Sequence, residues 1–343
     1  MKITIEDVAK LAQVSAGTVS NALTGKRPVA EATRQRIMDT IKVLGYEPDL
    51  LAQGLVNRYS RIISIVITEL LELGFYGYSS ALTGIQRKAN ELGYSIMLNF
   101  VNGKTDEEII TSVNQIRARR VDGIIWAVHE IKGNRDWVKK IQSQSYPPII
   151  FLHMHPDPKL NVVSIDNYSG AKMAVSHLID QGCKRIGIIT GPLDWWESQA
   201  RLSAWKDTLE INNLIPYPSL IIEGDWLAQS GQIGMKALLE RDKTIDGVFA
   251  CNDSMALGVL NTACELGLSI PKDILVVGYD DAPEAAYYWP PLTSVHQFLN
   301  QSGQTALEEL HDIIETGKKG ITYPIQRIIQ PELVIRKSSM RIN

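Results

Sequence analysis

The apolar positions in the first fifty residues recur every three or four residues, which is the spacing of amphipathic helices. Over residues 3–23 this spacing predicts two short helices separated by a turn. Thr4 and Ser15 stand where each helix needs an N-cap, and Asp7 follows Thr4 at the distance of a capping box. A third helix is predicted from about residue 30 to residue 44. The N-terminal part of the chain is therefore predicted to be a small all-α unit that contains a helix–turn–helix.

From residue 61 onward the pattern changes to short apolar runs that alternate with amphipathic stretches. Continuous apolar runs are typical of buried parallel strands, and the stretches between them are typical of helices that cover both faces of a sheet. Two successive series predict two doubly wound α/β lobes with a ligand cleft between them. The predicted strands are 62–67, 94–100, 123–128, 148–153, 184–190, 219–223, 247–250 and 275–279, and the predicted helices are 78–92, 106–119, 136–144, 168–181, 197–212, 228–240 and 253–266.

The composition excludes several classes of protein. Apolar residues make up 45% of the 343 positions and charged residues 21%, a balance typical of multidomain globular proteins and not of disordered ones. No apolar run is long enough to span a membrane, and the acidic residues near the start do not fit a signal peptide, so we expect a cytoplasmic protein. The three cysteines are odd in number and widely spaced, which predicts neither a disulfide framework nor a metal site. Residues 1–60 carry a net charge of +2 and the remainder −5, which favours an anionic partner for the helical unit.

No catalytic motif accompanies the predicted lobes. His129-Glu130 lacks the second histidine of a zinc-binding helix, and His153-Met154-His155 has no third ligand nearby. Neither a P-loop nor a Gly-x-Gly-x-x-Gly sequence follows a predicted strand. We therefore expect no enzyme activity, no cofactor and no metal.

A further set of residues occurs in a specific order over nearly the whole chain. In the helical unit and the linker it comprises residues 5–12, 14–15, 18–20, 22–23, 29, 33–34, 36–37, 44–46, 48, 52–53 and 55. In the lobes it comprises Asp122-Gly123-Ile124-Ile125, Gly191-Pro192, Asn252-Asp253, Gly278-Tyr279-Asp280-Asp281 and Pro291-Leu292-Thr293. With these residues at this spacing, the chain resembles the LacI/GalR family of bacterial transcription regulators.

The resemblance implies a multidomain chain with an all-α helix–turn–helix head and an α/β two-lobed body like that of periplasmic binding proteins. The head would comprise residues 1–47, a hinge helix or linker 48–60, and the effector-binding and dimerisation body 61–343. Within the body, one lobe would comprise about 61–160 plus a crossover near 290–322, and the other about 161–289 plus the C-terminal segment.

The resemblance also implies a sequence-specific DNA-binding transcription regulator. We expect a repressor whose operator affinity is controlled by a small sugar or sugar derivative bound between the lobes. Its other partners would be palindromic double-stranded operator DNA and a second copy of the chain, because a two-fold protein suits a two-fold site. Bound to its operator, it would be associated with the nucleoid. No heptad tail for tetramers follows residue 336, so a homodimer is expected.

Two alternatives to this function are a regulator that responds to nucleobases or nucleosides, and a sugar-binding protein without regulatory DNA binding. The sequence leaves open the identity of the effector and whether it induces or corepresses. It also leaves open which operator the protein binds, which genes it controls, and whether it represses or activates them.

By this resemblance the second helix enters the major groove of DNA. Other members often carry larger polar side chains at positions 16 and 17 and commonly Arg at 21, so we expect an operator that differs at the corresponding bases. Leu55 matches the position at which a hinge helix wedges into the minor groove, although the leucines of this segment would alternatively pack on the body. The residues expected to face bases are Ala16, Gly17, Thr18 and Asn21, and those expected to offer hydroxyls to phosphates are Thr4, Ser15, Ser20, Thr24 and Thr33.

The resemblance and the predicted strand ends together indicate effector-binding residues, because sugars need aromatic faces for their C–H patches and polar groups for their hydroxyls. Trp226 matches a tryptophan that stacks on the sugar ring in the family, and Asn252 and Asp280 fall where the family holds hydroxyls. Gln199 aligns best with a hydroxyl-binding arginine of other members, but Arg201 follows two residues later, so which of the two contacts the ligand stays open. The remaining candidates are Phe75, Tyr78, Trp126, His153 and Trp196.

Three further interpretations concern tryptophans. The adjacent Trp195 and Trp196 hint at a larger or glycosidic sugar. Trp205 lies on the predicted buried face of its helix and is expected in the core, whereas Trp137 is expected to anchor a helix at the surface.

Overall fold

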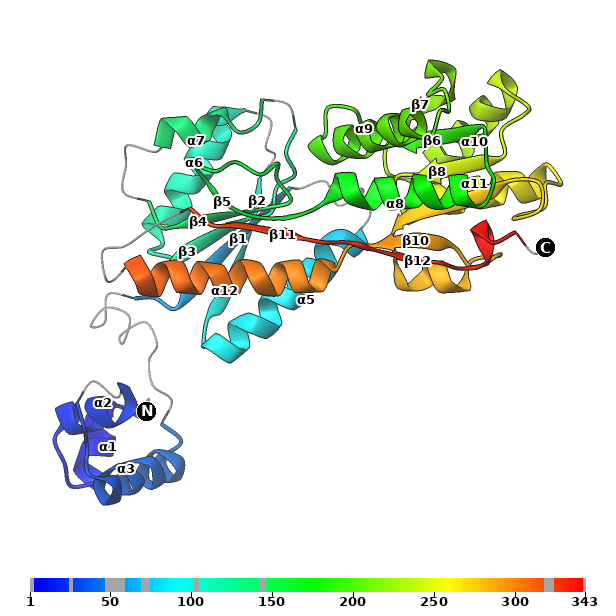
Figure 1. Ribbon diagram of the computed structural model, residues 1–343. Coiled ribbons are helices and arrows are strands. Elements are labelled where there is room, and N and C mark those ends of the chain that lie inside the picture. Colours follow the sequence, from blue (N-terminus) through cyan, green and yellow to red (C-terminus); the bar gives the residue numbers. More distant parts are fainter. Residues whose placement is uncertain are drawn as a thin grey trace. The chain divides into compact units, whose positions relative to one another are not determined.

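The computed structural model of the protein consists of two compact units, Met1–Ser60 and Arg61–Asn343 (Figure 1). Within the described part of the chain, no helix is long and apolar enough to cross a membrane. Residues 48–58 of the predicted hinge helix or linker, with Leu55, lie outside the described residues. These are residues 3–24, 27–46, 59–68, 75–101, 105–131, 133–141, 146–317 and 324–341.

The predicted helix–turn–helix is confirmed in the first unit, which contains α1 (Ile5–Leu11), α2 (Ala16–Thr24) and α3 (Glu31–Leu44). Thr4 forms a capping box, in which the Asp7 N–H donates to Thr4 Oγ1 and the Thr4 N–H donates to Asp7 Oδ2 at 2.8 Å. Ser15 Oγ accepts a hydrogen bond from the Thr18 N–H at 3.1 Å, at the start of α2. Side-chain oxygens therefore satisfy backbone donors at the first turns of α1 and α2.

The core of this unit is small but includes all three helices. Val8 of α1, Val19 of α2 and Ile37 of α3 are fully buried in one apolar cluster. Arg36 Nε donates to the carbonyl oxygen of Ala12 at 3.0 Å, which ties α3 to the turn between α1 and α2. The position of α2 is therefore set both by its cap and by contacts with its neighbours.

The second unit, the body, contains two lobes, each built on a six-stranded sheet (Figure 1). In the first lobe every neighbouring pair of strands is parallel, as the continuous apolar runs predict. The strand order is β11-β5-β4-β3-β1-β2. Its strands are β1 (Ile62–Thr68), β2 (Ser95–Val101), β3 (Gly123–Trp126), β4 (Ile149–Leu152), β5 (Asn161–Ile165) and β11 (Gln326–Ile329), and its helices are α5 (Phe75–Leu92), α6 (Asp106–Ala118), α7 (Asp136–Ile141) and α12 (Leu299–Gly317).

The second lobe repeats this plan with the order β12-β10-β9-β8-β6-β7. Only the short β12 is antiparallel to its neighbour within this sheet. Its strands are β6 (Ile186–Thr190), β7 (Ile221–Glu223), β8 (Gly247–Ala250), β9 (Leu275–Asp280), β10 (Thr293–His296) and β12 (Glu332–Val334), and its helices are α8 (Asn167–Asp180), α9 (Trp196–Ile211), α10 (Ala228–Arg241) and α11 (Asp253–Glu265).

The chain passes between the lobes at three places, and these correct the expected lobe boundaries. The first passage follows β5, so residues 161–165 belong to the first lobe and not to the second. The second lies between β10 and α12, so residues 293–296 belong to the second lobe while the following helix packs on the first. The third lies between β11 and β12, which Figure 1 shows as one stretch running from lobe to lobe. The sequence pattern missed β5, β10, β11 and β12, which have only three to five residues each.

Glycines bring helices into backbone contact in both lobes. A Cβ atom at Gly258 of α11 would lie 2.0 Å from the carbonyl oxygen of Ala228 in α10. In the first lobe, a Cβ atom at Gly84 of α5 would lie 1.9 Å from the carbonyl oxygen of Asn300 in α12. Only glycine allows this approach. The N-terminal end of α11, which contributes to the site described below, is positioned by the first of these contacts.

Two expectations about tryptophans can be compared with this core. Trp205 is fully buried in the second lobe, as expected. Trp137 is also fully buried, with its ring centroid 4.6 Å from that of Trp126, so its expected role as a surface anchor is wrong. Because α7 is short and its apolar residues face the sheet, the large side chain of Trp137 completes the core of the first lobe.

Candidate functional site

A cavity of about 260 Å³ lies in the body where the two lobes meet. Its residues follow strands or begin helices: His129 comes after β3, Trp226 lies between β7 and α10, and Asp280 ends β9. The carboxyl ends of parallel strands are where ligands bind in doubly wound folds. The volume is near the lower end of the range for small-molecule sites, which suits a ligand of one or two rings.

The structure brings half of the predicted effector residues together at this cavity. One comes from the end of β4 in the first lobe, and the others come from α9, the β7–α10 loop, the start of α11 and the end of β9 in the second. The side chains of Phe75 and Tyr78 lie outside the described residues. The predicted residues that line the cavity are His153, Arg201, Trp226, Asn252 and Asp280.

Trp126 does not line the cavity, which corrects its prediction as an effector residue. Its side chain is fully buried in the core of the first lobe and packs on Trp137. It is the last residue of β3, in which all four residues are buried. Because both faces of this sheet are covered, the apolar pattern did not reveal to which face the side chain points.

Trp196 and Gln199 also lie outside the cavity, and the reason is helical periodicity on α9. Glu197 and Arg201, four residues apart, share the face that lines it. Trp196 instead meets the ring of His155 edge-on at 5.9 Å, and Gln199 is exposed and donates to the carbonyl oxygen of Leu193. The choice left open between Gln199 and Arg201 therefore falls on Arg201 as the one that lines the cavity. The two adjacent tryptophans do not act as a pair, since only Trp195 reaches the cavity, and the hint of a larger sugar loses its support.

Sequence reasoning missed several residues of the cavity wall. Spacing along α9 could have identified Glu197, because it stands one helical turn before Arg201. Nothing in the local pattern marks the others, which lie in loops or at the first residue of a helix. The missed residues include His129, Asn167, Glu197, Asp253 and Gln297.

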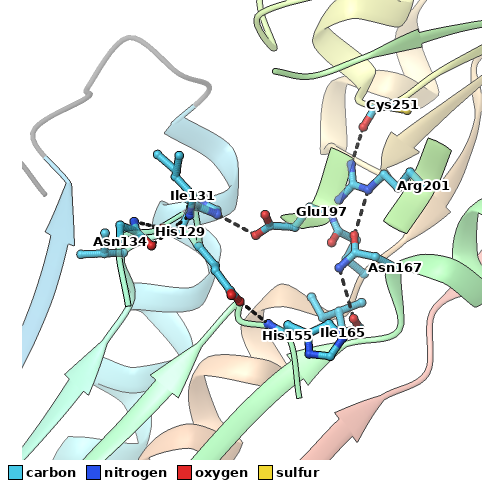
Figure 2. Close-up of polar contacts among 12 residues, drawn as sticks. His129, Ile131, Asn134, His155, Ile165, Asn167, Glu197, Arg201 and Cys251 are labelled. Atoms are coloured by element: carbon cyan, nitrogen blue, oxygen red, sulfur yellow. Dashed lines mark hydrogen bonds and ion pairs between the residues drawn. The ribbon is translucent and has the colours of Figure 1, made fainter. Parts of the chain in front are cut away.

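Arg201 is held in place by acceptors from two other elements (Figure 2). Its Nε donates to Asn167 Oδ1 at 2.8 Å, and its Nη1 donates to the carbonyl oxygen of Cys251. The guanidinium carbon lies 3.7 Å from the ring centroid of Tyr279 and 5.5 Å from that of Trp226. With 4% of its surface exposed, Arg201 is a buried positive charge with a preset orientation.

Asp280 lines the same cavity as Arg201 and has a shifted pKa. Its Oδ1 accepts a hydrogen bond from Gln297 Nε2 at 2.5 Å. Burial raises the pKa of Asp280 to about 6, although Arg201 and Gln297 act in the opposite direction. Burial and the nearby Asp280 also raise the pKa of Asp253 well above its usual value. The cavity thus contains two neighbouring carboxyl groups that resist being ionised together.

The side-chain amide of Asn252 already forms hydrogen bonds within the protein. Its Oδ1 accepts from the Met255 N–H at 2.8 Å and so caps α11, while its Nδ2 donates to the carbonyl oxygen of Trp226 at 2.9 Å. Trp226 has a φ of 73°, an unusual conformation for a residue other than glycine. The Asn252 side chain therefore positions Trp226, and its predicted contact with a hydroxyl stays a prediction.

A series of aromatic rings crosses the cavity from one lobe to the other. The ring of His153 lies 5.6 Å from that of His129, which lies 4.5 Å from Trp195, which lies 5.8 Å from Trp226. Burial and the charge of His129 lower the pKa of His153 to about 4, so its imidazole is neutral at neutral pH. These flat faces form an apolar surface beside the charged groups.

Two buried polar atoms at the cavity have no hydrogen-bond partner among the described residues. They are Glu197 Oε2 and Trp226 Nε1, on side chains of residues that are 6% and 7% exposed. Buried polar atoms are normally paired, since leaving one unpaired costs about 1–3 kcal/mol. The cavity therefore offers one free acceptor and one free donor to a ligand.

In the head, the predicted DNA-binding residues lie on and around α2. Gly17 is exposed, and Ala16, Thr18, Ser20 and Asn21 are half-buried. The hydroxyls of Thr4, Ser15 and Thr18 take part in the two caps, so these residues have a structural role in addition to any contact with DNA. Thr33 is half-buried at the start of α3, and the Thr24 side chain lies outside the described residues.

Comparison with known proteins adds to this geometry. Residues 4–49 match the profile of bacterial regulatory proteins of the lacI family, and residues 175–339 match that of periplasmic binding protein-like domains. The HTH-type transcriptional repressors PurR of Haemophilus influenzae (strain ATCC 51907) and of Mannheimia succiniciproducens are each 32% identical to this chain, over 98% and 99% of both sequences, respectively.

Two solved structures are also similar over nearly their full length. A lac repressor dimer bound to operator and the anti-inducer ONPF has a TM-score of 0.85 and 28% identity, and covers 99% of this chain and 100% of its own. A complex of the transcriptional regulator CelR with cellobiose has a TM-score of 0.73 and 29% identity, and covers 98% and 99%. This chain therefore belongs to the LacI/GalR family of bacterial regulators and is a DNA-binding transcriptional repressor, not an enzyme.

Proposed function

We propose that this repressor binds a small sugar or sugar derivative in the cavity between its lobes. The observation that carries the proposal is the placement of the Trp195 and Trp226 rings beside Arg201 and Asp280 in one cavity. Indole faces cover the C–H patches of a sugar ring, while a guanidinium and a carboxylate bind its hydroxyls. The similarity to CelR, solved with cellobiose, supports the same class of ligand.

A nucleobase is the second candidate, because the aromatic series would also cover a planar ring. Thermal unfolding of the full chain with single sugars and with adenine or hypoxanthine separates the two. A ligand that binds only the folded state raises the midpoint of unfolding, and the stabilisation grows with the logarithm of its concentration over its dissociation constant. A rise with a sugar and none with either base is the expected result, and the reverse would replace the sugar by the base.

We propose further that α2 reads operator DNA in the major groove, with Ala16, Gly17, Thr18 and Asn21 toward the bases. The exposed, capped N-terminal turn of α2 supports this placement. Asparagine pairs well with adenine, so Asn21 is expected to specify adenine where an arginine would specify guanine.

A selection of duplexes bound by the full chain, at a stated salt concentration, tests this assignment. Convergence on a palindrome is expected, with adenine at one position of each half-site. Asn21→Ala should relax the preference at that position alone, whereas Gln35→Ala, on the exposed side of α3, should leave the selected sequence unchanged. An unchanged sequence with Asn21→Ala would refute the role of this residue.

We propose that the repressor acts as a homodimer through exposed apolar side chains of the body. Leu98 and Phe100, on the edge strand β2, are 42% and 46% exposed, and Tyr287 and Trp289 in the second lobe are 88% and 91% exposed. Large exposed aromatics and an unpaired strand edge favour association. The lac repressor, which is similar over its full length, was solved as a dimer.

Light scattering of the wild type and of variants tests the homodimer. The wild type is expected at the mass of two chains, and the double variant Phe100→Ser with Trp289→Ser is expected to dissociate at micromolar concentration. Ile211→Ser is the matched control, because Ile211 is a similarly exposed apolar residue (71%) on α9 that belongs to neither patch. A monomeric wild type would refute the homodimer.

In this proposal the effector acts by changing how the two lobes meet. Residues of both lobes line the cavity, so a ligand bound there has different contacts when the lobes shift. Coupling of this kind is typically about 1–3 kcal/mol and reciprocal, so operator DNA must change effector affinity by the same factor. Titration of the effector with and without operator measures that factor, and its sign distinguishes inducer from corepressor.

A further inference from the structure

The two lobes touch along a short seam at one side of the cavity. Residues 129–131 of the first lobe lie against residues 195–197 of the second and form an isolated antiparallel bridge with them. The Trp196 N–H donates to the carbonyl oxygen of Glu130 at 3.0 Å. Any ligand in the cavity therefore lies next to a place where backbone from both lobes is already paired.

Glu197 joins this seam to the cavity (Figure 2). Its Oε1 is hydrogen-bonded to His129 Nδ1 of the other lobe at 2.9 Å. Its Oε2 is the buried acceptor without a partner, and the residue lines the cavity. One oxygen thus orients the carboxylate from across the seam, and the other is free for a hydrogen-bond donor on the ligand.

The charge around the cavity also bears on the ligand. Carboxyl groups of Glu197, Asp253, Asp280 and Glu284 line it, and Arg201 contributes a guanidinium. The guanidinium already donates to two protein acceptors and lies against the ring of Tyr279. An anionic group on the ligand would therefore meet several carboxyl groups and a cation that is already engaged, and repulsion from those that are ionised would disfavour its binding.

The charge state of Glu197 also disfavours an anionic ligand. Burial by itself would raise its pKa, but the charge of His129, the hydrogen bond with His129 and the N–H of Glu197 itself hold the pKa of Glu197 below its usual value. The carboxylate is therefore charged at neutral pH although it is buried.

We propose that Glu197 selects the effector: its Oε2 accepts a hydrogen bond from a hydroxyl of an unphosphorylated sugar and rejects the phosphorylated form of the same sugar. This inference rests on the proposed sugar-binding function. His129 is a positioning residue, which holds the carboxylate toward the ligand from the opposite lobe. Selectivity then has two sources: the site requires a hydrogen-bond donor on the ligand, and it repels a negatively charged phosphate.

The test uses the full chain with D-glucose, D-galactose, D-fructose and D-ribose, each with and without a terminal phosphate. Thermal unfolding first identifies which sugars bind, and calorimetric titration then gives their dissociation constants. The wild type is expected to bind an unphosphorylated sugar at least about tenfold more tightly than its phosphate.

Glu197→Gln keeps the shape of the side chain and removes its charge. It is expected to weaken binding of the unphosphorylated sugar about tenfold and to lower the ratio of the two dissociation constants several-fold, since the other carboxyl groups of the cavity remain. His129→Asn should weaken binding several-fold and lower the ratio by less than Glu197→Gln does, because burial then raises the pKa of Glu197 and reduces the charge of its carboxylate. Glu130→Gln is the matched control, since its Oε2 accepts from the His155 N–H at the same seam but does not line the cavity, and it should change neither quantity.

Three results would overturn the inference. If the wild type binds a sugar and Glu197→Gln has the same affinity and the same ratio, the role of Glu197 is wrong while the sugar-binding function stands. If the wild type prefers the phosphorylated sugar, the exclusion of anions is wrong. If no sugar in either form raises the unfolding midpoint, or only adenine or hypoxanthine does so, the sugar-binding function fails and the inference fails with it.

Discussion

Replacement of Arg201 by methionine removes the cation around which one wall of the cavity is organised. Two buried acceptors, Asn167 Oδ1 and the carbonyl oxygen of Cys251, would each lose a donor, at about 1–3 kcal/mol apiece. The contact with the ring of Tyr279 at 3.7 Å contributes up to about 2 kcal/mol when shielded from water. Methionine offsets part of this loss, because it fills the space and needs no desolvation of a charge. We expect the free energy of unfolding to fall by about 3 kcal/mol.

Urea unfolding followed by tryptophan fluorescence measures this loss in the body alone, because all seven tryptophans lie between residues 126 and 289. Gln199→Met is the matched control on the same helix. Gln199 is exposed and donates only to the carbonyl oxygen of Leu193 within the described structure, so its replacement should change stability by less than about 0.5 kcal/mol. Equal effects of the two substitutions, or a loss below about 1 kcal/mol for Arg201→Met, would refute the account of the buried network.

Three other substitutions test separate parts of the structure. The pKa of Asp280, about 6 against about 3.9 in an unfolded chain, means that its protonated form stabilises the body below pH 4 and that this contribution is lost as the pH rises through 6. In urea unfolding, the free energy of unfolding of the wild type should fall by about 2 kcal/mol between pH 4 and 7 because of Asp280, and Asp280→Asn should abolish that fall. An unchanged dependence of stability on pH would contradict the assignment. Gly258→Ala should cost about 3 kcal/mol in the same assay at neutral pH, because the new Cβ would lie 2.0 Å from the carbonyl oxygen of Ala228. Ser15→Ala removes the cap on α2, at about 1 kcal/mol, and should speed hydrogen exchange of the Thr18 amide about fivefold; unchanged exchange would show that this cap is not needed.

Elements with a strong local pattern were predictable from the sequence. The helix–turn–helix followed from apolar spacing and from caps whose partners lie three residues away, such as Thr4 with Asp7. The run over residues 62–67 became β1 nearly residue for residue. In contrast, β11 pairs with β5, whose residues precede it by more than 160 positions, and neither short segment carries a pattern that marks its partner. Such pairing depends on where the chain passes between the lobes.

The residues of the candidate site likewise divide into those that a local pattern predicts and those that it does not. His153 and Asp280 were predictable as cavity residues because the carboxyl ends of parallel strands share one edge of a sheet. Trp126 was wrongly predicted to line the cavity. Every residue of β3 is buried, so the sequence pattern does not distinguish a side chain that points to the cavity from one that points to the core. Gln199 was misplaced because alignment to other proteins ignores which face of α9 is turned inward.

The sequence by itself determined the two units, most of their helices and strands, and the residue types at the strand ends, because each of these follows from a pattern within a few positions along the chain. Only the tertiary structure decided which of those residues meet. Glu197 and His129 are 68 positions apart and belong to different lobes, yet their hydrogen bond orients the free carboxylate oxygen at the cavity. That contact exists because three passages of the chain bring the ends of the two sheets together, a long-range geometry that no local pattern encodes.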